Sequence, residues 1–247
     1  CIYISSVFWF SCLFKEYLFY LFFRKMIFHV APMMGYTDYY FRNLLHFLYS
    51  DNIKTYSEMI VDKAIIYNAE KTFTKHFCKS NKSIIQIAGS NPKEISECIK
   101  ILDNIPHISE INFNLGCPSS RVQENKLGLA LTQYPDEVNG CLEEISNSNK
   151  IISVKCRLGL GLEEDQDYIY NFLTMFKNMN INKVIIHCRN GVLNLNTKKN
   201  RTIPKINYEL FFKCFQDFPD VKLIPNGEIN NTEIINNFKK NNINEVM

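Results

Sequence analysis

Polar and ionisable side chains stand at the end of nearly every short apolar run of this sequence. Cys117 follows the run at 110–116, Lys155 and His187 lie in two later runs, and Asn226 ends another. Cys117 differs from the other cysteines because it lies in a Gly-Cys-Pro turn that is followed by polar residues, where a side chain can face a pocket. These positions predict one active site centred on the Cys117 thiol.

Each of these residues also has an alternative interpretation. A lysine inside a barrel needs an anionic partner, which a phosphate or a flavin ring could supply, whereas a Schiff-base lysine is the aldolase alternative. His187 is either part of the site or a hydrogen-bonded core histidine, and Glu58, Gln86 and Asn226 are equally compatible with structural hydrogen bonding. Their convergence at strand ends, more than any single residue, indicates a site.

The elements that would position these residues alternate along the chain. From Met26 onward, short apolar runs alternate with longer amphipathic stretches, as in repeated βα units around a parallel sheet. One helix is expected directly after Asn91, which would cap it, with Pro92 at its first position. Strands are expected at 28–33, 53–59, 83–89, 110–116, 151–157, 183–189 and 221–227, and an eighth begins within 243–247.

This rhythm predicts an α/β protein with a TIM (β/α)8 barrel that stops before the end of its eighth βα unit. In such a barrel the active site lies at the carboxyl ends of the strands, which is where the polar residues fall. A doubly wound open sheet is the alternative, but no GxGxxG motif follows the first strand.

Composition limits the class of protein further. With 247 residues, of which 46% are hydrophobic, the chain suits one sizeable domain. The formal charge of +3 permits binding to a polyanion without predicting it. The nine cysteines show no paired spacing, which argues against a disulfide framework and a structural zinc site and favours a reducing compartment. We expect no metal and no stable protein partner.

Two segments are expected along the chain. Residues 1–25 form an uncertain apolar segment that Lys15 and Glu16 interrupt, with an anchor, a targeting sequence or a non-native extension as its interpretations. Residues 26–247 form the catalytic barrel domain. We expect the protein in the cytoplasm. If residues 1–25 are a targeting sequence, an organelle is the alternative location. Membrane association through residues 1–25 is the less favoured interpretation.

Several motifs resemble those of the tRNA-dihydrouridine synthase family, and in particular the bacterial tRNA-dihydrouridine(20/20a) synthases. VAPMMGYTD at 30–38, YSEM, QIAGSNP and INFNLGCPSSRVQ occur in the order of that family, and VKCRLG, IIHCR and PNGEI follow them. The resemblance implies a flavoenzyme in which NADPH reduces FMN and reduced FMN saturates the C5–C6 bond of a D-loop uridine in tRNA, at position 20 or 20a.

The resemblance also implies a role for each site residue. Cys117 would be the catalytic general acid that protonates C5 after hydride reaches C6, because an ordinary thiol is protonated at neutral pH. The FMN contacts would be Pro32, Met33, Met34, Gln86, Lys155, His187, Asn226, Gly227 and Glu228. The tRNA contacts would be Asn114 at the base and Lys198 and Arg201 elsewhere.

Two rival functions stay open at this point. One is an FMN-dependent dehydrogenase of a free pyrimidine, and the other is a tRNA-binding protein without catalysis. The loop GCPSSRVQ and the basic stretch NTKKNR favour RNA over a free base. The resemblance places a phosphate-binding Gly-Arg pair and a helical tRNA-binding domain after the eighth strand, beyond Met247.

Overall fold

Eight parallel strands form the centre of the computed structural model, which describes residues 26–77 and 83–247. Their order in the sheet is β7-β6-β5-β4-β3-β2-β1-β8. The strands are β1 (Ile27–Val30), β2 (Ile53–Val61), β3 (Ser83–Ala88), β4 (Ile108–Asn114), β5 (Ile151–Arg157), β6 (Lys183–His187), β7 (Lys222–Asn226) and β8 (Glu245–Val246). The predicted TIM barrel is confirmed, while the interpretations of residues 1–25 lie outside the described residues.

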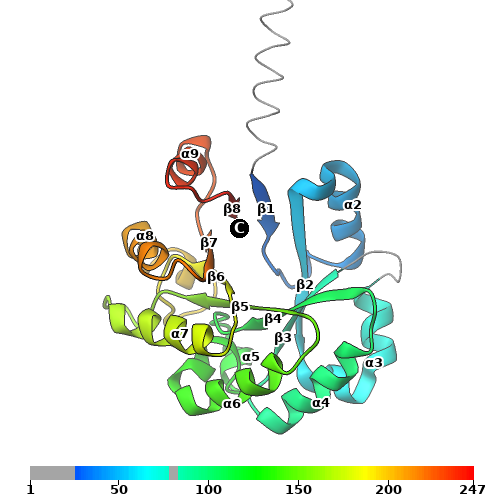
Figure 1. Cartoon of the computed structure of the whole chain (residues 1–247). Helices are drawn as coiled ribbons and strands as arrows, with labels where there is room; N and C mark the ends of the chain where they lie inside the picture. Colours follow the sequence, from blue (N-terminus) through cyan, green and yellow to red (C-terminus); the bar gives the residue numbers. More distant parts are fainter. Residues whose placement is uncertain (1–25, 78–82) are drawn as a thin grey trace, which may run out of the picture.

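Helices surround the strands, so that Figure 1 shows a ring that runs from α2 to α9 with the sheet inside it. They are α2 (Tyr39–Tyr49), α3 (Asp62–His76), α4 (Pro92–Asp103), α5 (Ser120–Gln123), α6 (Pro135–Ser146), α7 (Gln166–Asn178), α8 (Tyr208–Asp217) and α9 (Thr232–Lys240), with 3-10 turns η1 (Ser50–Asn52), η2 (Gly128–Gln133) and η3 (Lys199–Arg201). The expected cap of α4 is confirmed, because the Asn91 side chain accepts a hydrogen bond from the Lys93 backbone N–H at 3.0 Å. None of the helices in the described ranges is long and apolar enough to cross a membrane.

The apolar core lies mainly between the sheet and the helices. On β4, Ile111 and Phe113 are fully buried and belong to this layer. Because side chains alternate along a strand, Glu110, Asn112 and Asn114 face the other way, into the barrel. A second, smaller apolar cluster consists of Tyr56, Ile84, Ile185 and Ile224. The barrel interior therefore combines a small apolar cluster with several buried polar side chains.

The barrel is nearly closed. β8 pairs with β1 in parallel, with Phe28 opposite Val246. On its other side, the Met247 backbone N–H donates to the Pro225 carbonyl at 2.8 Å, which connects the end of the chain to β7. Both β1 and β7 are thus held by the few residues at 245–247.

The expected strand positions hold for all eight strands, but several boundaries differ. β1 ends at Val30, three residues earlier than predicted, so Met33 and Met34 do not end the strand. They lie in a turn in which the Tyr36 and Thr37 backbone N–H groups both donate to the Met33 carbonyl. Pro32 supplies no N–H for a strand ladder, which explains the early end.

Candidate active site

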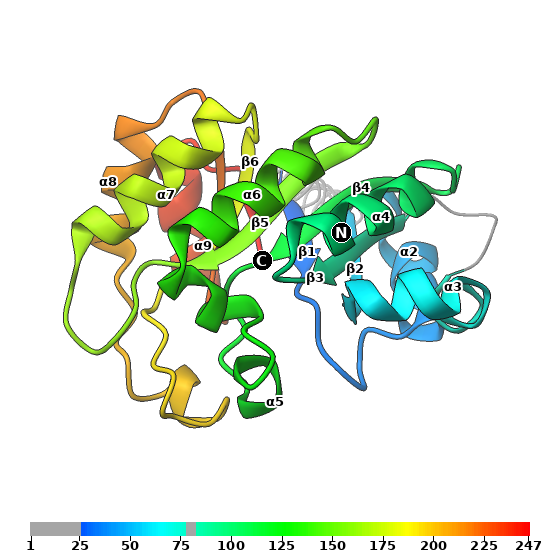
Figure 2. The same ribbon diagram turned by 90° about the horizontal axis from the view of Figure 1, so that it is seen from below.

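A cavity with a volume of about 1060 Å³ opens at the carboxyl ends of the strands. It brings together ten of the predicted residues: Pro32, Met33, Met34, Gln86, Asn114, Cys117, Lys155, His187, Arg201 and Asn226. Figure 2 shows α5 and the segment containing η3 on the same side of the molecule as the loop after β1. A second cavity of about 440 Å³, between Lys150 and Lys183 at the opposite end of the barrel, holds none of the predicted residues.

The Cys117 turn is held by hydrogen bonds on every side. The Asn114 side-chain oxygen accepts from the backbone N–H groups of Gly116 at 3.1 Å and Cys117 at 3.0 Å. The Arg157 Nε donates to the Gly116 carbonyl at 2.9 Å, and the Leu129 N–H donates to the Cys117 carbonyl at 3.1 Å. The half-buried thiol lies 3.5 Å from the Ser119 hydroxyl and borders the cavity. The sulfur is therefore accessible while its backbone is fixed.

Gly128 closes this turn from the far side. Its φ is +59°, and a Cβ there would lie only 2.8 Å from the Cys117 carbonyl oxygen. A residue with a side chain would be strained by the left-handed backbone and would also displace the turn. The close approach of this glycine thus contributes to the position of Cys117.

Lys155 brings a positive charge to the cavity without an acidic partner. Its Nζ donates to the Asn226 side-chain oxygen at 2.9 Å, and no ion pair in residues 26–77 and 83–247 includes it. Burial, with a smaller contribution from the nearby Arg157 cation, lowers the pKa of Lys155 to about 8. A half-buried ammonium beside a neutral amide fits an anionic or electron-rich ligand.

His187 offers an unpaired nitrogen at the same wall. Its Nε2 is buried and has no hydrogen-bond partner within the described part of the chain. Burial, followed by the charges of Arg157 and Lys155, lowers the pKa of His187 well below its ordinary value, so the ring is neutral near pH 7. A Cβ at Gly227, where φ is +110°, would lie 3.2 Å from this nitrogen. The glycine therefore lets the backbone pass close to this nitrogen, where a side chain would crowd the imidazole.

Three predicted residues lie outside the cavity wall. Gly227 contacts His187, as described, and Glu228 forms an ion pair with the buried Arg189. Lys198 is exposed directly before η3, whereas Arg201, at the end of η3, is exposed and also reaches the cavity. Glu228 therefore pairs with a buried arginine and does not line the cavity.

Several residues that border or support the site were not among those predicted. Arg157 anchors the Cys117 turn, and Asp62 lines the cavity as a buried carboxyl whose pKa is raised by burial. Glu58, for which the sequence left a site role and a structural one open, accepts a hydrogen bond from the Gly35 N–H and approaches His76 Nδ1 at 3.4 Å. Arg157 could have been predicted from the sequence, because it lies at the carboxyl end of an expected strand.

The arrangement joins three chemical capacities around one cavity. A thiol on the β4 side can donate a proton, a cation on β5 can stabilise negative charge, and a neutral imidazole on β6 can hydrogen-bond a ring. Met33 and Met34 provide an apolar surface beside them, and both methionines are substantially exposed to the cavity opening. The site suits a planar, electron-rich cofactor and a second planar group next to the thiol.

Comparison with known proteins agrees with this description. The family model described as "Dihydrouridine synthase (Dus)" matches residues 29–247. The chain is 33% identical to a tRNA-dihydrouridine(20/20a) synthase of Synechocystis sp. over 83% of its own length and 62% of the relative. It is 30% identical to the protein of that name from Pseudomonas putida over 82% of the chain and 60% of the relative, and 32% identical to the one from Pasteurella multocida over 83% and 63%. The chain thus spans about 60% of the length of these relatives.

Proposed function

This chain belongs to the dihydrouridine synthase (Dus) family, whose enzymes are flavin-dependent oxidoreductases acting on uridine. On this premise we propose that the protein reduces uridine in tRNA to 5,6-dihydrouridine, with FMN as its flavin and NADPH as the reductant. The names of its relatives support position 20 or 20a as the target. We also propose the cytoplasm as its location.

The observation that carries this proposal is that Lys155, His187 and Cys117 line the same cavity. The ammonium without an acidic partner and the unpaired imidazole nitrogen both fit the isoalloxazine ring of FMN. The volume of about 1060 Å³ is ample for such a ring together with a uracil. When bound and reduced by NADPH, FMN would supply hydride for C6 of the uracil.

The residues of this chain would carry the remaining steps. Cys117 would donate its proton to C5 of the uracil, and Asn114 would orient the base beside the thiol. Lys155, protonated below about pH 8, would stabilise negative charge on the ring, and His187 would hydrogen-bond its edge. Pro32, Met33, Met34 and Gln86 would bind the flavin ring, with Asn226, Gly227 and Glu228 holding the loop near its phosphate.

The tRNA itself would approach from the η3 side of the opening. Arg201 is exposed and reaches the cavity, and Lys198 lies three residues before it on the same exposed turn. Cations at this position can bind the phosphates next to the base that enters the cavity. Residues 26–247 would form the FMN-binding catalytic domain, and tRNA contacts from a further helical domain remain a prediction.

The direct test is conversion of an unmodified tRNA by the native protein with NADPH, followed by mass spectrometry for dihydrouridine. We expect a gain of two hydrogens at one D-loop uridine, a yellow purified protein, and no reduction of free uracil. Cys117→Ala should lower product formation by about 10²-fold or more, whereas Cys141→Ala, which changes a buried cysteine of α6, should not. Reduction of free uracil, or a colourless protein that binds tRNA without converting it, would contradict the proposal in favour of one of the two rivals.

A further inference from the structure

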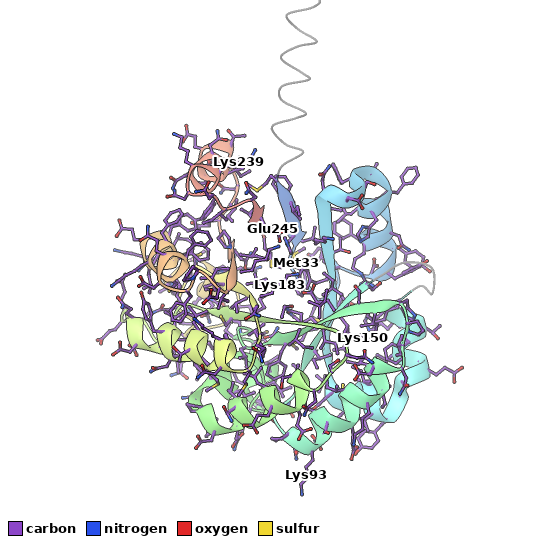
Figure 3. All side chains as sticks on the ribbon, viewed as in Figure 1. Met33, Lys93, Lys150, Lys183, Lys239 and Glu245 are labelled. Carbon is purple, nitrogen blue, oxygen red and sulfur yellow. The ribbon has the colours of Figure 1, made fainter. Side chains whose placement is uncertain are left out.

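Glu110 lies inside the barrel on β4, and the proposed function gives it no role. Its side chain is only 7% exposed and accepts hydrogen bonds from Lys183 Nζ at 2.8 and 2.9 Å and from the Ser153 hydroxyl at 2.6 Å. Figure 3 shows Lys183 near the middle of the ring of helices, whereas Lys93 points away from it. Because desolvation offsets the attraction in a buried ion pair, a net gain in stability does not follow from this one.

A continuous series of side-chain hydrogen bonds connects this ion pair to Cys117. We call its members, Glu110, Ser153, Asn112, Gln86 and Asn114, the Glu110 chain. Asn112 Nδ2 donates to Ser153 Oγ at 2.8 Å, Gln86 Nε2 donates to Asn112 Oδ1 at 2.7 Å, and Asn114 Nδ2 donates to Gln86 Oε1 at 2.9 Å. Asn114 Oδ1 then accepts from the Gly116 and Cys117 backbone N–H groups.

The sheet register explains why these side chains meet. Gln86 on β3, Asn112 on β4 and Ser153 on β5 are direct cross-strand neighbours. Glu110, Asn112 and Asn114 alternate along β4, so all three face the barrel interior. The register of the parallel sheet therefore places these side chains close enough to form a continuous series of hydrogen bonds from Glu110 to the cavity.

The two ends of the Glu110 chain dictate its direction. A carboxylate can only accept hydrogen bonds, so Ser153 must give its single proton to Glu110 and accept from Asn112. Backbone N–H groups can only donate, so the Asn114 oxygen must face Gly116 and Cys117. Between these ends, each amide has one orientation that satisfies both neighbours, and reversing any one of them would place two donors or two acceptors together.

We propose that Glu110 is a positioning residue, which through the Glu110 chain fixes the orientation of the Asn114 amide and thereby holds the Cys117 turn in place. Lys183 belongs to the same device, because its ammonium donates to both carboxylate oxygens of Glu110 and so fixes that side chain beside Ser153. The link to catalysis rests on the proposed function, whereas the link to the Cys117 backbone does not.

Two variants test this link. Glu110→Gln replaces one of the two accepting oxygens with an NH2 group that can donate, and it removes the negative charge that pairs with Lys183. Ser153→Ala interrupts the series one step later and leaves the ion pair intact, so it also serves if Glu110→Gln folds poorly. The matched control is Glu245→Gln, which changes a partly buried carboxylate on β8 that bonds His29 and Lys222 and no member of the Glu110 chain.

The readouts are amide hydrogen exchange at Gly116 and Cys117 and the rate of Cys117 alkylation by iodoacetamide, followed by peptide mass spectrometry. Losing the fixed acceptor should raise exchange at both amides by about fivefold, the effect of about one hydrogen bond, in Glu110→Gln and in Ser153→Ala. Alkylation of Cys117 should change by a similar factor. The control should alter neither quantity. Exchange and alkylation that stay within the range of the control in both variants would overturn the proposal.

A kinetic measurement separates this inference from the proposed function. If the protein makes dihydrouridine, both variants should lower kcat by roughly tenfold while KM for tRNA is unchanged, because a displaced acid affects the reaction more than binding. Altered exchange in a protein that forms no dihydrouridine would contradict the proposed function and support the positioning role. Unchanged exchange in variants of a protein that does form dihydrouridine would support the proposed function and contradict the positioning role.

Discussion

Two polar clusters occupy the interior of this barrel, and they are built differently. The Glu110 chain rises toward the cavity and ends at the Cys117 turn. The other, which we call the floor cluster, consists of His29, Tyr56, Glu245 and Lys222 near the amino end of β1. His29 hydrogen-bonds the Tyr56 hydroxyl and the Glu245 carboxylate, each at 2.9 Å, and Lys222 pairs with the second oxygen of Glu245.

The difference lies in what each cluster leaves open. In the floor cluster both ring nitrogens of His29 have hydrogen-bond partners, and the cluster connects β1 and β2 to β7 and β8, where the sheet closes. The cavity end of the barrel keeps a cation without an acidic partner, an unpaired imidazole nitrogen and a thiol. Polar residues inside one barrel can thus either close the fold or remain available to a ligand, and their partners distinguish the two.

The largest effect should come from the thiol at the cavity end. Cys117→Ala should lower dihydrouridine formation by about 10²- to 10⁴-fold, the usual contribution of a general acid. The melting temperature should change little, because the thiol is half-buried and its backbone contacts remain. Single-turnover assays together with calorimetry would check this. If Cys117→Ala is as active as the unchanged protein, or if it unfolds, the proposed division between a reactive cavity end and a stabilising floor cluster would be wrong.

The next effect should come from the cation without an acidic partner. Lys155→Met should weaken FMN binding by about tenfold or more, since a desolvated charge pair is worth at least ~1.4 kcal/mol, while the free energy of unfolding stays within about 1 kcal/mol. In the unchanged protein, FMN affinity should fall as pH rises through about 8, because the folded protein then loses the Lys155 proton. Flavin fluorescence titrations would measure both, and Lys155→Arg should move the decline to higher pH.

The floor cluster should instead respond in stability. Burial raises the pKa of Glu245, but hydrogen bonds from His29 and Lys222 outweigh it and lower this pKa to about 2. A depressed carboxyl pKa stabilises the fold above the unfolded value of about 4.3, and this stabilisation is lost as pH falls toward 2. Glu245→Gln should therefore cost about 1–3 kcal/mol at pH 7 and nothing near pH 2. Denaturant titrations would measure this, and a loss of the same size at both pH values would contradict it.

The smallest effects should lie at the rim of the cavity. Arg201→Ala and Lys198→Ala should each reduce the salt dependence of tRNA binding by a slope of about 1 and leave kcat for bound tRNA unchanged. Arg201 should have the larger effect on KM, because it borders the cavity and Lys198 does not. Equal effects would show that distance from the cavity does not matter for binding tRNA.

The sequence pattern was sufficient to predict the barrel and most of its site. Alternating apolar runs located all eight strands, and ten of the predicted residues line one cavity. Boundaries were less accurate at β1, where the turn at Met33 depends on local hydrogen bonds and on Pro32. Glu58 shows a further limit, since the sequence left a site role and structural hydrogen bonding equally open, and only its contacts with Gly35 and His76 favour the structural one.

The sequence by itself determined which residues reach the carboxyl ends of the strands, because alternation along a strand is a local property of the chain. Only the tertiary structure decided which of these residues already have hydrogen-bond partners within the protein. Glu110, Asn112 and Ser153 read as ordinary strand residues until the register places them side by side. Hydrogen-bond direction depends on partners that are distant in the chain, so the Glu110 chain and the unpaired His187 nitrogen become visible only after folding.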